Sequence, residues 1–124
     1  MAGRVMRISP RERIWLDPAR IGVLYTELGG AEVQALLDRA MGELSVILAE
    51  MTGQFGRGEV AGFARNLRRM RRIADHLGLP TLTAVAGHVE DCLTRPDDIA
   101  LAATWARLAR NAERALAGGW DSAG

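Results

Sequence analysis

Residues 63–90 read FARNLRRMRRIADHLGLPTLTAVAGHVE, and this stretch decides the fold of the chain. It contains five arginines and both histidines of the protein. At about 100° per residue, as in an α-helix, its first half separates into two opposite faces. The apolar face consists of Phe63, Leu67, Met70, Ala74 and Leu77. The other face carries Arg65, Arg68, Arg69, Arg72 and His76. We therefore predict an amphipathic helix with a buried stripe and an exposed basic face.

Helical spacing also extends upstream of this stretch. Asp17 accepts hydrogen bonds from free backbone N–H groups and Pro18 suits a first helical position, so a first helix is expected over residues 18–28. Two glycines then end it. Apolar residues recur at helical spacing over residues 31–55, which predicts a long second helix. Gly56 to Gly58 should end that helix, and a third should open near Glu59.

Residues that end or cap helices also divide the second half of the chain. Gly78 and Pro80 stop the third helix, and Thr81 is expected to cap a fourth, whose last apolar residue is Leu93. Asp97 and the next aspartate favour the first turn of a last helix, over residues 97–117. The pattern contains no strand-like alternation, so we predict no strand.

Five helices with short connections favour antiparallel neighbours. The predicted fold class is therefore all-α, an antiparallel four-helix bundle with a short additional N-terminal helix. With 124 residues, the chain suits one domain, which we place at residues 14–117. Residues 1–13 and 118–124 are expected to be N-terminal and C-terminal tails.

Composition narrows the classes of function. Sixteen Lys and Arg against fifteen Asp and Glu give a formal charge of +1, so the whole molecule has no strong field for nucleic acid. No segment is apolar enough for a signal peptide or a membrane span, and the single cysteine, Cys92, favours a reducing compartment. We expect a cytoplasmic protein that binds neither membrane nor nucleic acid. The spacing of histidine and cysteine suggests no metal site, and we expect no cofactor.

The motifs resemble the histidine-containing phosphotransfer (Hpt) domains of bacterial two-component phosphorelays. Those domains carry a helix reading roughly H-x-L-K-G, then a glycine and a helix reading L-x-x-L-[small]-x-x-L-E. The second part is matched here without a gap by Gly78, Leu82, Val85, Ala86, Val89 and Glu90. The resemblance covers about residues 14–117 and implies the same bundle fold.

The same alignment places Arg68 where the family has its phosphoacceptor histidine. Met70 stands at the family's leucine, Arg71 at its lysine and Arg72 at its small glycine. Met70 can fill the core site of the leucine, and Arg71 keeps a cation that could help to hold a phosphoryl group. A guanidinium is always protonated and cannot attack phosphorus, so the resemblance implies a degenerate member without the acceptor.

These residues lead to one functional expectation and two alternatives. The chain is expected to be a non-enzymatic Hpt-like module that binds a response-regulator receiver domain or a histidine kinase. The expected contact residues are Arg65, Arg68, Arg69, Arg71, Arg72 and His76. One alternative is an active phosphotransfer protein that uses His76, although a histidine near a helix C-terminus more simply interacts with the helix dipole. The other is a structural or oligomerising bundle, with the arginines solvated or paired with acids.

Three further residues have simple structural interpretations. His88 lies beside acidic residues, and its i, i+3 spacing to Asp91 allows a pair, so we expect a structural histidine. Trp15 and Trp120 lie outside the apolar stripes. We expect them to seal the bundle, with a homodimer contact as the alternative.

Overall fold

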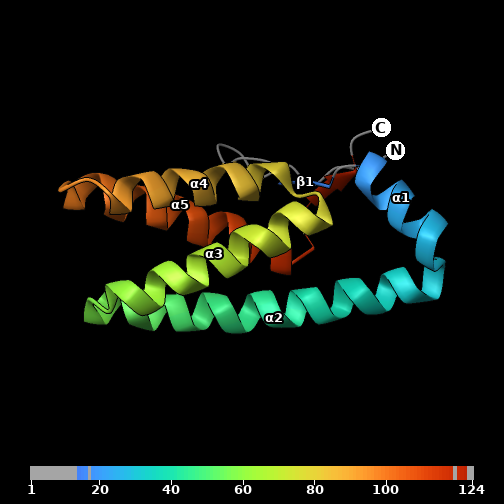
Figure 1. The fold of residues 1–124 in the computed structure, drawn as a ribbon, viewed down its shortest axis with the longest axis horizontal. Helices are drawn as coiled ribbons and strands as arrows, with labels where there is room; N and C mark the ends of the chain where they lie inside the picture. The colour runs from blue at the N-terminus through green and yellow to red at the C-terminus, as the bar shows by residue number, and fades with distance from the viewer. Residues whose placement is uncertain (1–13, 17, 119, 123–124) are drawn as a thin grey trace.

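The computed structural model describes residues 14–16, 18–118 and 120–122 (Figure 1). Along the chain, the elements within these residues are β1 (Ile14–Leu16), α1 (Pro18–Leu28), α2 (Gly30–Arg57), α3 (Val60–Leu77), α4 (Pro80–Leu93), α5 (Asp98–Leu116) and β2 (Trp120–Ser122). The predicted N-terminal tail, residues 1–13, and the predicted helix start at Asp17 lie outside the described residues.

The predicted all-α bundle is confirmed. Successive helices pack against each other from α2 to α5, and α5 returns to contact α2. Figure 1 shows α1 at one end of the molecule, where it folds back from the start of the long α2. The turns between α2 and α3 and between α4 and α5 lie together at the opposite end. The bundle therefore has one end covered by α1 and another formed by two helix connections.

Two of the helix ends depend on glycine. Gly58 follows α2 with φ 70°, and Gly78 follows α3 with φ 73°. Both lie in the left-handed region, which glycine adopts without the steric cost that a Cβ atom brings. Each donates its backbone N–H to carbonyls of the last helical turn. Gly56, which we expected to break α2, lies within the helix instead, because a glycine with ordinary helical angles only weakens a helix.

The start of α4 also differs from the prediction. Thr81 was expected to cap this helix, but the N-cap residue is Leu79, which makes no side-chain capping bond, and Pro80 occupies the first turn. Proline fits that position because it has no N–H to satisfy. Of the two aspartates expected in the first turn of α5, Asp98 lies there, whereas Asp97 is the N-cap residue, whose carboxylate accepts a hydrogen bond of 2.9 Å from the backbone N–H of Ala100.

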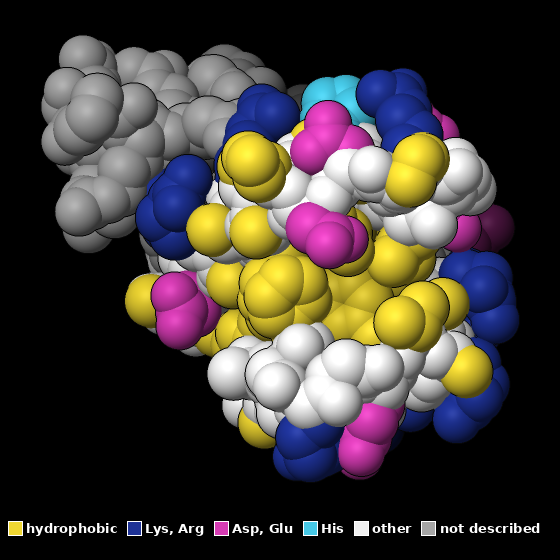
Figure 2. All heavy atoms as spheres, turned by 90° about the vertical axis from the view of Figure 1, so that its left-hand side faces the viewer, with side chains coloured by type: hydrophobic (Ala, Val, Ile, Leu, Met, Phe, Trp, Pro, Cys, Tyr) yellow, Lys and Arg dark blue, Asp and Glu magenta, His cyan; other side chains and the backbone are white. Residues whose placement is uncertain are grey.

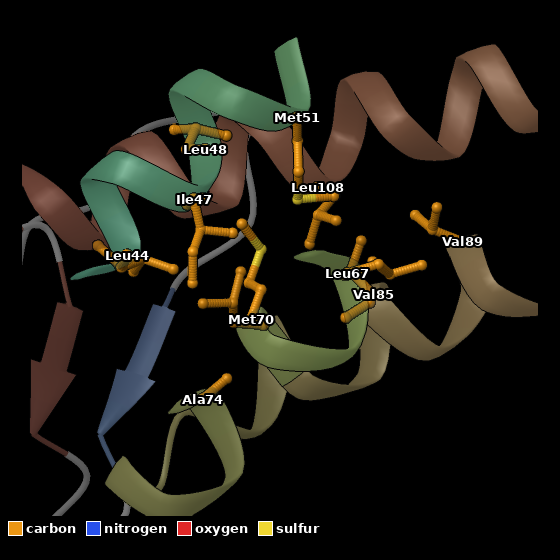
Figure 3. Packing of buried hydrophobic residues seen from close by; sticks show 14 of the residues in the cluster. Leu44, Ile47, Leu48, Met51, Leu67, Met70, Ala74, Val85, Val89 and Leu108 are labelled. Carbon is orange, nitrogen blue, oxygen red and sulfur yellow. The ribbon is translucent and has the colours of Figure 1, made fainter. Parts of the chain in front are cut away.

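The core lies where the apolar stripe of α3 meets the other helices. All five residues of that stripe are at most 2% exposed. Figure 3 shows Leu67 and Met70 of α3 pointing toward Ile47 and Met51 of α2 and Leu108 of α5. Burying each such side chain contributes about 2 kcal/mol, so this stripe fixes how α3 is rotated about its axis.

Two three-residue strands correct the expectation of an entirely helical chain. β1 and β2 pair in parallel, with Ile14 beside Trp120 and Leu16 beside Ser122. Residues 120–122, within the predicted C-terminal tail, therefore form a strand. Strands this short leave no alternating pattern, and their partners lie more than a hundred residues apart, so local sequence could not reveal them. The side chains of Trp15 and Trp120, expected to seal the bundle, lie outside what the structure describes.

Candidate functional site

The basic face of α3 is the candidate site. Because the apolar stripe is buried, the helix turns Arg65, Arg68, Arg72 and His76 to the surface. These four residues and Arg71 are exposed. The expected exposure of Arg68 on this helix is confirmed. Most of the predicted contact residues therefore share one accessible region of α3.

Three of these arginines keep free guanidinium groups. Among the described residues, Arg65, Arg68 and Arg72 make no hydrogen bond or ion pair. Arg68 and Arg72 are four residues apart, so their charges lie on neighbouring turns of the same surface. Like charges at this spacing destabilise a helix by about 0.2–0.5 kcal/mol. The fold thus keeps two adjacent cations that do nothing to stabilise α3.

The other two arginines are held by side chains of the bundle. Arg69 is half-buried and donates to Asn66 Oδ1 at 3.1 Å and to Glu43 Oε2 of α2 at 3.2 Å. Arg71 forms an ion pair with Glu90 of α4. For these two arginines the structure therefore shows the alternative prediction, in which the arginines pair with acids on neighbouring helices.

Hollows lie on both sides of α3 beside Arg72. Between α3 and α4 lies an open hollow of about 390 Å³. Its lining residues are Arg68, Arg71, Arg72, Asp75, Thr83 and Glu90. A second hollow of about 340 Å³ lies between α2 and α3, and Arg72 and His76 line it beside apolar residues such as Leu36 and Ile73. Arg72 borders both hollows, so its guanidinium lies on α3 between them.

A buried asparagine, Asn66, lies beneath this face and was not predicted from the sequence. Asn66 is 5% exposed, and its amide donates to Glu50 Oε1 and to Gln54 Oε1, each at 3.1 Å. Its carbonyl oxygen accepts the bond from Arg69. The signal was present, because Asn66 follows Phe63 by three residues and therefore falls on the edge of the apolar stripe. A polar group there needs partners, and these link α2 to α3.

His76 lies in the last turn of α3 and contacts α1. Arg20 Nε donates to the backbone carbonyl of His76 at 2.7 Å, and Arg20 Nη2 lies 2.9 Å from its Nδ1. A guanidinium has only donors, so Nδ1 accepts this bond and the ring proton is on Nε2. The same imidazole therefore ties the end of α3 to α1. Neither ring nitrogen is then a free nucleophile, which disfavours His76 as a phosphoacceptor.

His88 is separate from the basic face. It is exposed on α4, and its Nδ1 lies 3.4 Å from Arg107 Nη1 of α5. The expected pairing with Asp91 is replaced by this contact between helices. The described part of the chain contains no group of three or more His, Cys, Asp or Glu residues that could hold a metal ion.

Two findings concern more than the basic face of α3. In the described ranges, no helix is both long enough and apolar enough to cross a membrane. Comparisons with protein families, with curated proteins and with solved structures find no match to this chain.

Proposed function

We propose that this protein is an Hpt-like binding module of a two-component phosphorelay, without a phosphoacceptor of its own. It would dock a response-regulator receiver domain, or a histidine kinase, through the α3 face in the cytoplasm. The observation that carries the proposal is the pair Arg68 and Arg72, which are exposed, line the same hollow and have no ion-pair partner among the described residues. In the resemblance to Hpt domains, Arg68 stands where the phosphorylated histidine would be.

Charge complementarity explains why such a face would suit a receiver domain. The phosphorylation pocket of a receiver is acidic, and fixed cations opposite it speed association and set the orientation of the complex. Arg69 and Arg71 contribute less, because Glu43 and Glu90 already neutralise them. We therefore assign the attraction chiefly to Arg68 and Arg72, with Arg65 at the edge of the same face.

Charge reversal tests this assignment directly. In binding measurements against purified receiver domains and histidine kinases, R68E/R72E should weaken the complex by at least about tenfold, as expected when attraction becomes repulsion. The matched control is R95E/R110E, which reverses two exposed arginines away from α3. Equal effects of the two double variants, or no association with any receiver or kinase, would contradict the proposal and favour a purely structural bundle.

Phosphotransfer is tested separately. A receiver domain carrying a labelled aspartyl phosphate should pass no label to this protein, because Arg68 cannot attack phosphorus and both ring nitrogens of His76 are engaged or protonated. Label that appears on the wild type and disappears in His76→Ala would overturn the non-phosphorylated assignment.

A further inference from the structure

A second candidate surface lies at the end of the bundle far from α1. The connection from α2 to α3 and the connection from α4 to α5 meet there around a hollow of about 220 Å³, here called the distal hollow. Its described lining residues include Phe55, Val60, Phe63, Leu93 and Leu101. Figure 2 views this end and shows apolar side chains gathered in the middle of it, with acidic and basic side chains around them.

Aromatic rings form a firm floor beneath this hollow. The ring centroid of Phe63 lies 5.7 Å from that of Phe55 and 5.1 Å from that of Trp105, in an edge-to-face arrangement with the latter. The chain has only two phenylalanines, and both are here. Phe63 and Trp105 are buried, so packing within the bundle holds the floor in place.

One apolar side chain of the lining is open to solvent. Val60, at the start of α3, is 59% exposed. Leu93 of α4 and Leu101 of α5 line the hollow as well and are partly buried. Apolar side chains around an aromatic-floored hollow are typical of a site that another molecule covers.

Charge and volume restrict what can cover it. Among the described residues that line the hollow, Glu59 and Asp98 are acidic and none is basic. Arg57 pairs with Glu59 from outside the lining, whereas Asp98 has no ion-pair partner among the described residues. Pockets for whole small molecules usually measure about 300–1,000 Å³, so this volume suits one or two large apolar side chains.

We propose that the distal hollow binds a peptide segment of a partner protein in which one or two large apolar side chains are flanked by Lys or Arg. The apolar side chain would rest on the aromatic floor beside Val60 and Leu101, and the flanking cation would lie near Asp98. Such an anchor in a desolvated pocket, with polar contacts around it, is how a few residues supply most of the affinity in protein interfaces. This inference does not depend on the α3 face.

Three labelled peptides of equal length test the proposed chemistry by fluorescence anisotropy. One is a Leu/Lys peptide, the second replaces Lys with Glu, and the third replaces Leu with Ser. Only the Leu/Lys peptide should bind well, and amide resonances of Gly58 and Leu101 should shift on its addition. Binding of the Leu/Glu peptide with equal affinity, or shifts centred on another surface, would overturn the proposal.

Matched variants locate the contact. V60Q should weaken binding of the Leu/Lys peptide by at least about tenfold, as for loss of an anchoring contact. V46Q makes the same change at a valine of α2 that is 56% exposed, and it should leave binding unchanged. Equal losses in both variants would overturn the proposal, as would a homodimer that V60Q dissociates, since the occupant would then be a second copy of this chain.

Discussion

Replacing Asn66 by aspartate should test the buried polar link between α2 and α3. In the wild-type protein, the Asn66 amide donates to Glu50 and to Gln54, while its carbonyl oxygen accepts from Arg69. N66D keeps the shape of the side chain but removes both donors. It also places a negative charge against the carboxylate of Glu50. The change therefore alters hydrogen bonding and charge with almost no change in packing.

The size of the effect can be worked out from these contacts. Two lost hydrogen bonds cost about 2 kcal/mol, and repulsion from the solvent-exposed Glu50 adds at least about 1 kcal/mol. A new ion pair with Arg69 returns about 0.5 kcal/mol. We expect N66D to lower the free energy of unfolding by roughly 2.5 kcal/mol, or the Tm by roughly 10 °C for a chain of this size.

Acidification should distinguish this explanation from a simple loss of packing. The neighbouring negative charge raises the pKa of the introduced carboxyl in the folded state, so folded N66D binds more protons than unfolded N66D. Its stability relative to the wild type should therefore rise as the pH falls. Urea unfolding followed by circular dichroism measures both effects, with Ser45→Asp as a control on the exposed side of α2. A wild-type-like N66D, or a deficit independent of pH, would refute the reasoning.

Two further predictions concern α4 and the turn before α3. Gly87→Ala should raise the free energy of unfolding by about 0.5–1 kcal/mol, because the added Cβ would lie 3.5 Å from Arg71, an ordinary contact, and alanine favours a helix interior; an unchanged or lower urea midpoint would argue against this. The hydrogen bond from Arg57 lowers the pKa of Glu59, so the small stabilisation from this pair should exist at neutral pH and disappear as the pH falls through that pKa. Carboxyl NMR titration should show the Glu59 pKa rising in R57Q, and no change would contradict the assigned cause.

The sequence predicted the helices well because their apolar spacing and their glycines act locally. The buried stripe from Phe63 to Leu77 and the exposure of Arg68 follow from helical periodicity alone. The start of α4 at Pro80 was less predictable, because a nearby threonine matched the rule for a capping residue equally well. Periodicity fixes which face is buried, whereas capping depends on backbone angles that no single residue determines.

The candidate site was less predictable, because periodicity shows which side chains are exposed and not what they contact. Arg69 and Arg72 fall on the same predicted face, yet Glu43 reaches only Arg69. The bond between Arg20 and His76 also joins helices that are distant in sequence. Such pairings depend on how helices are placed beside one another, so the sequence could predict an arginine cluster but could not tell which arginines pair with acids and which stay free.

The parallel pairing of β1 and β2 has a mechanical consequence. The chain enters the pair beside Ile14 and leaves it beyond Ser122, so force applied to the two ends pulls the strands along their length in opposite directions. Their hydrogen bonds then carry the load in shear, all at once, whereas antiparallel strands pulled from one end would open bond by bond. Force applied through the two chain ends would therefore strain the β1–β2 pair before it reached the helices that carry the basic face and the distal hollow.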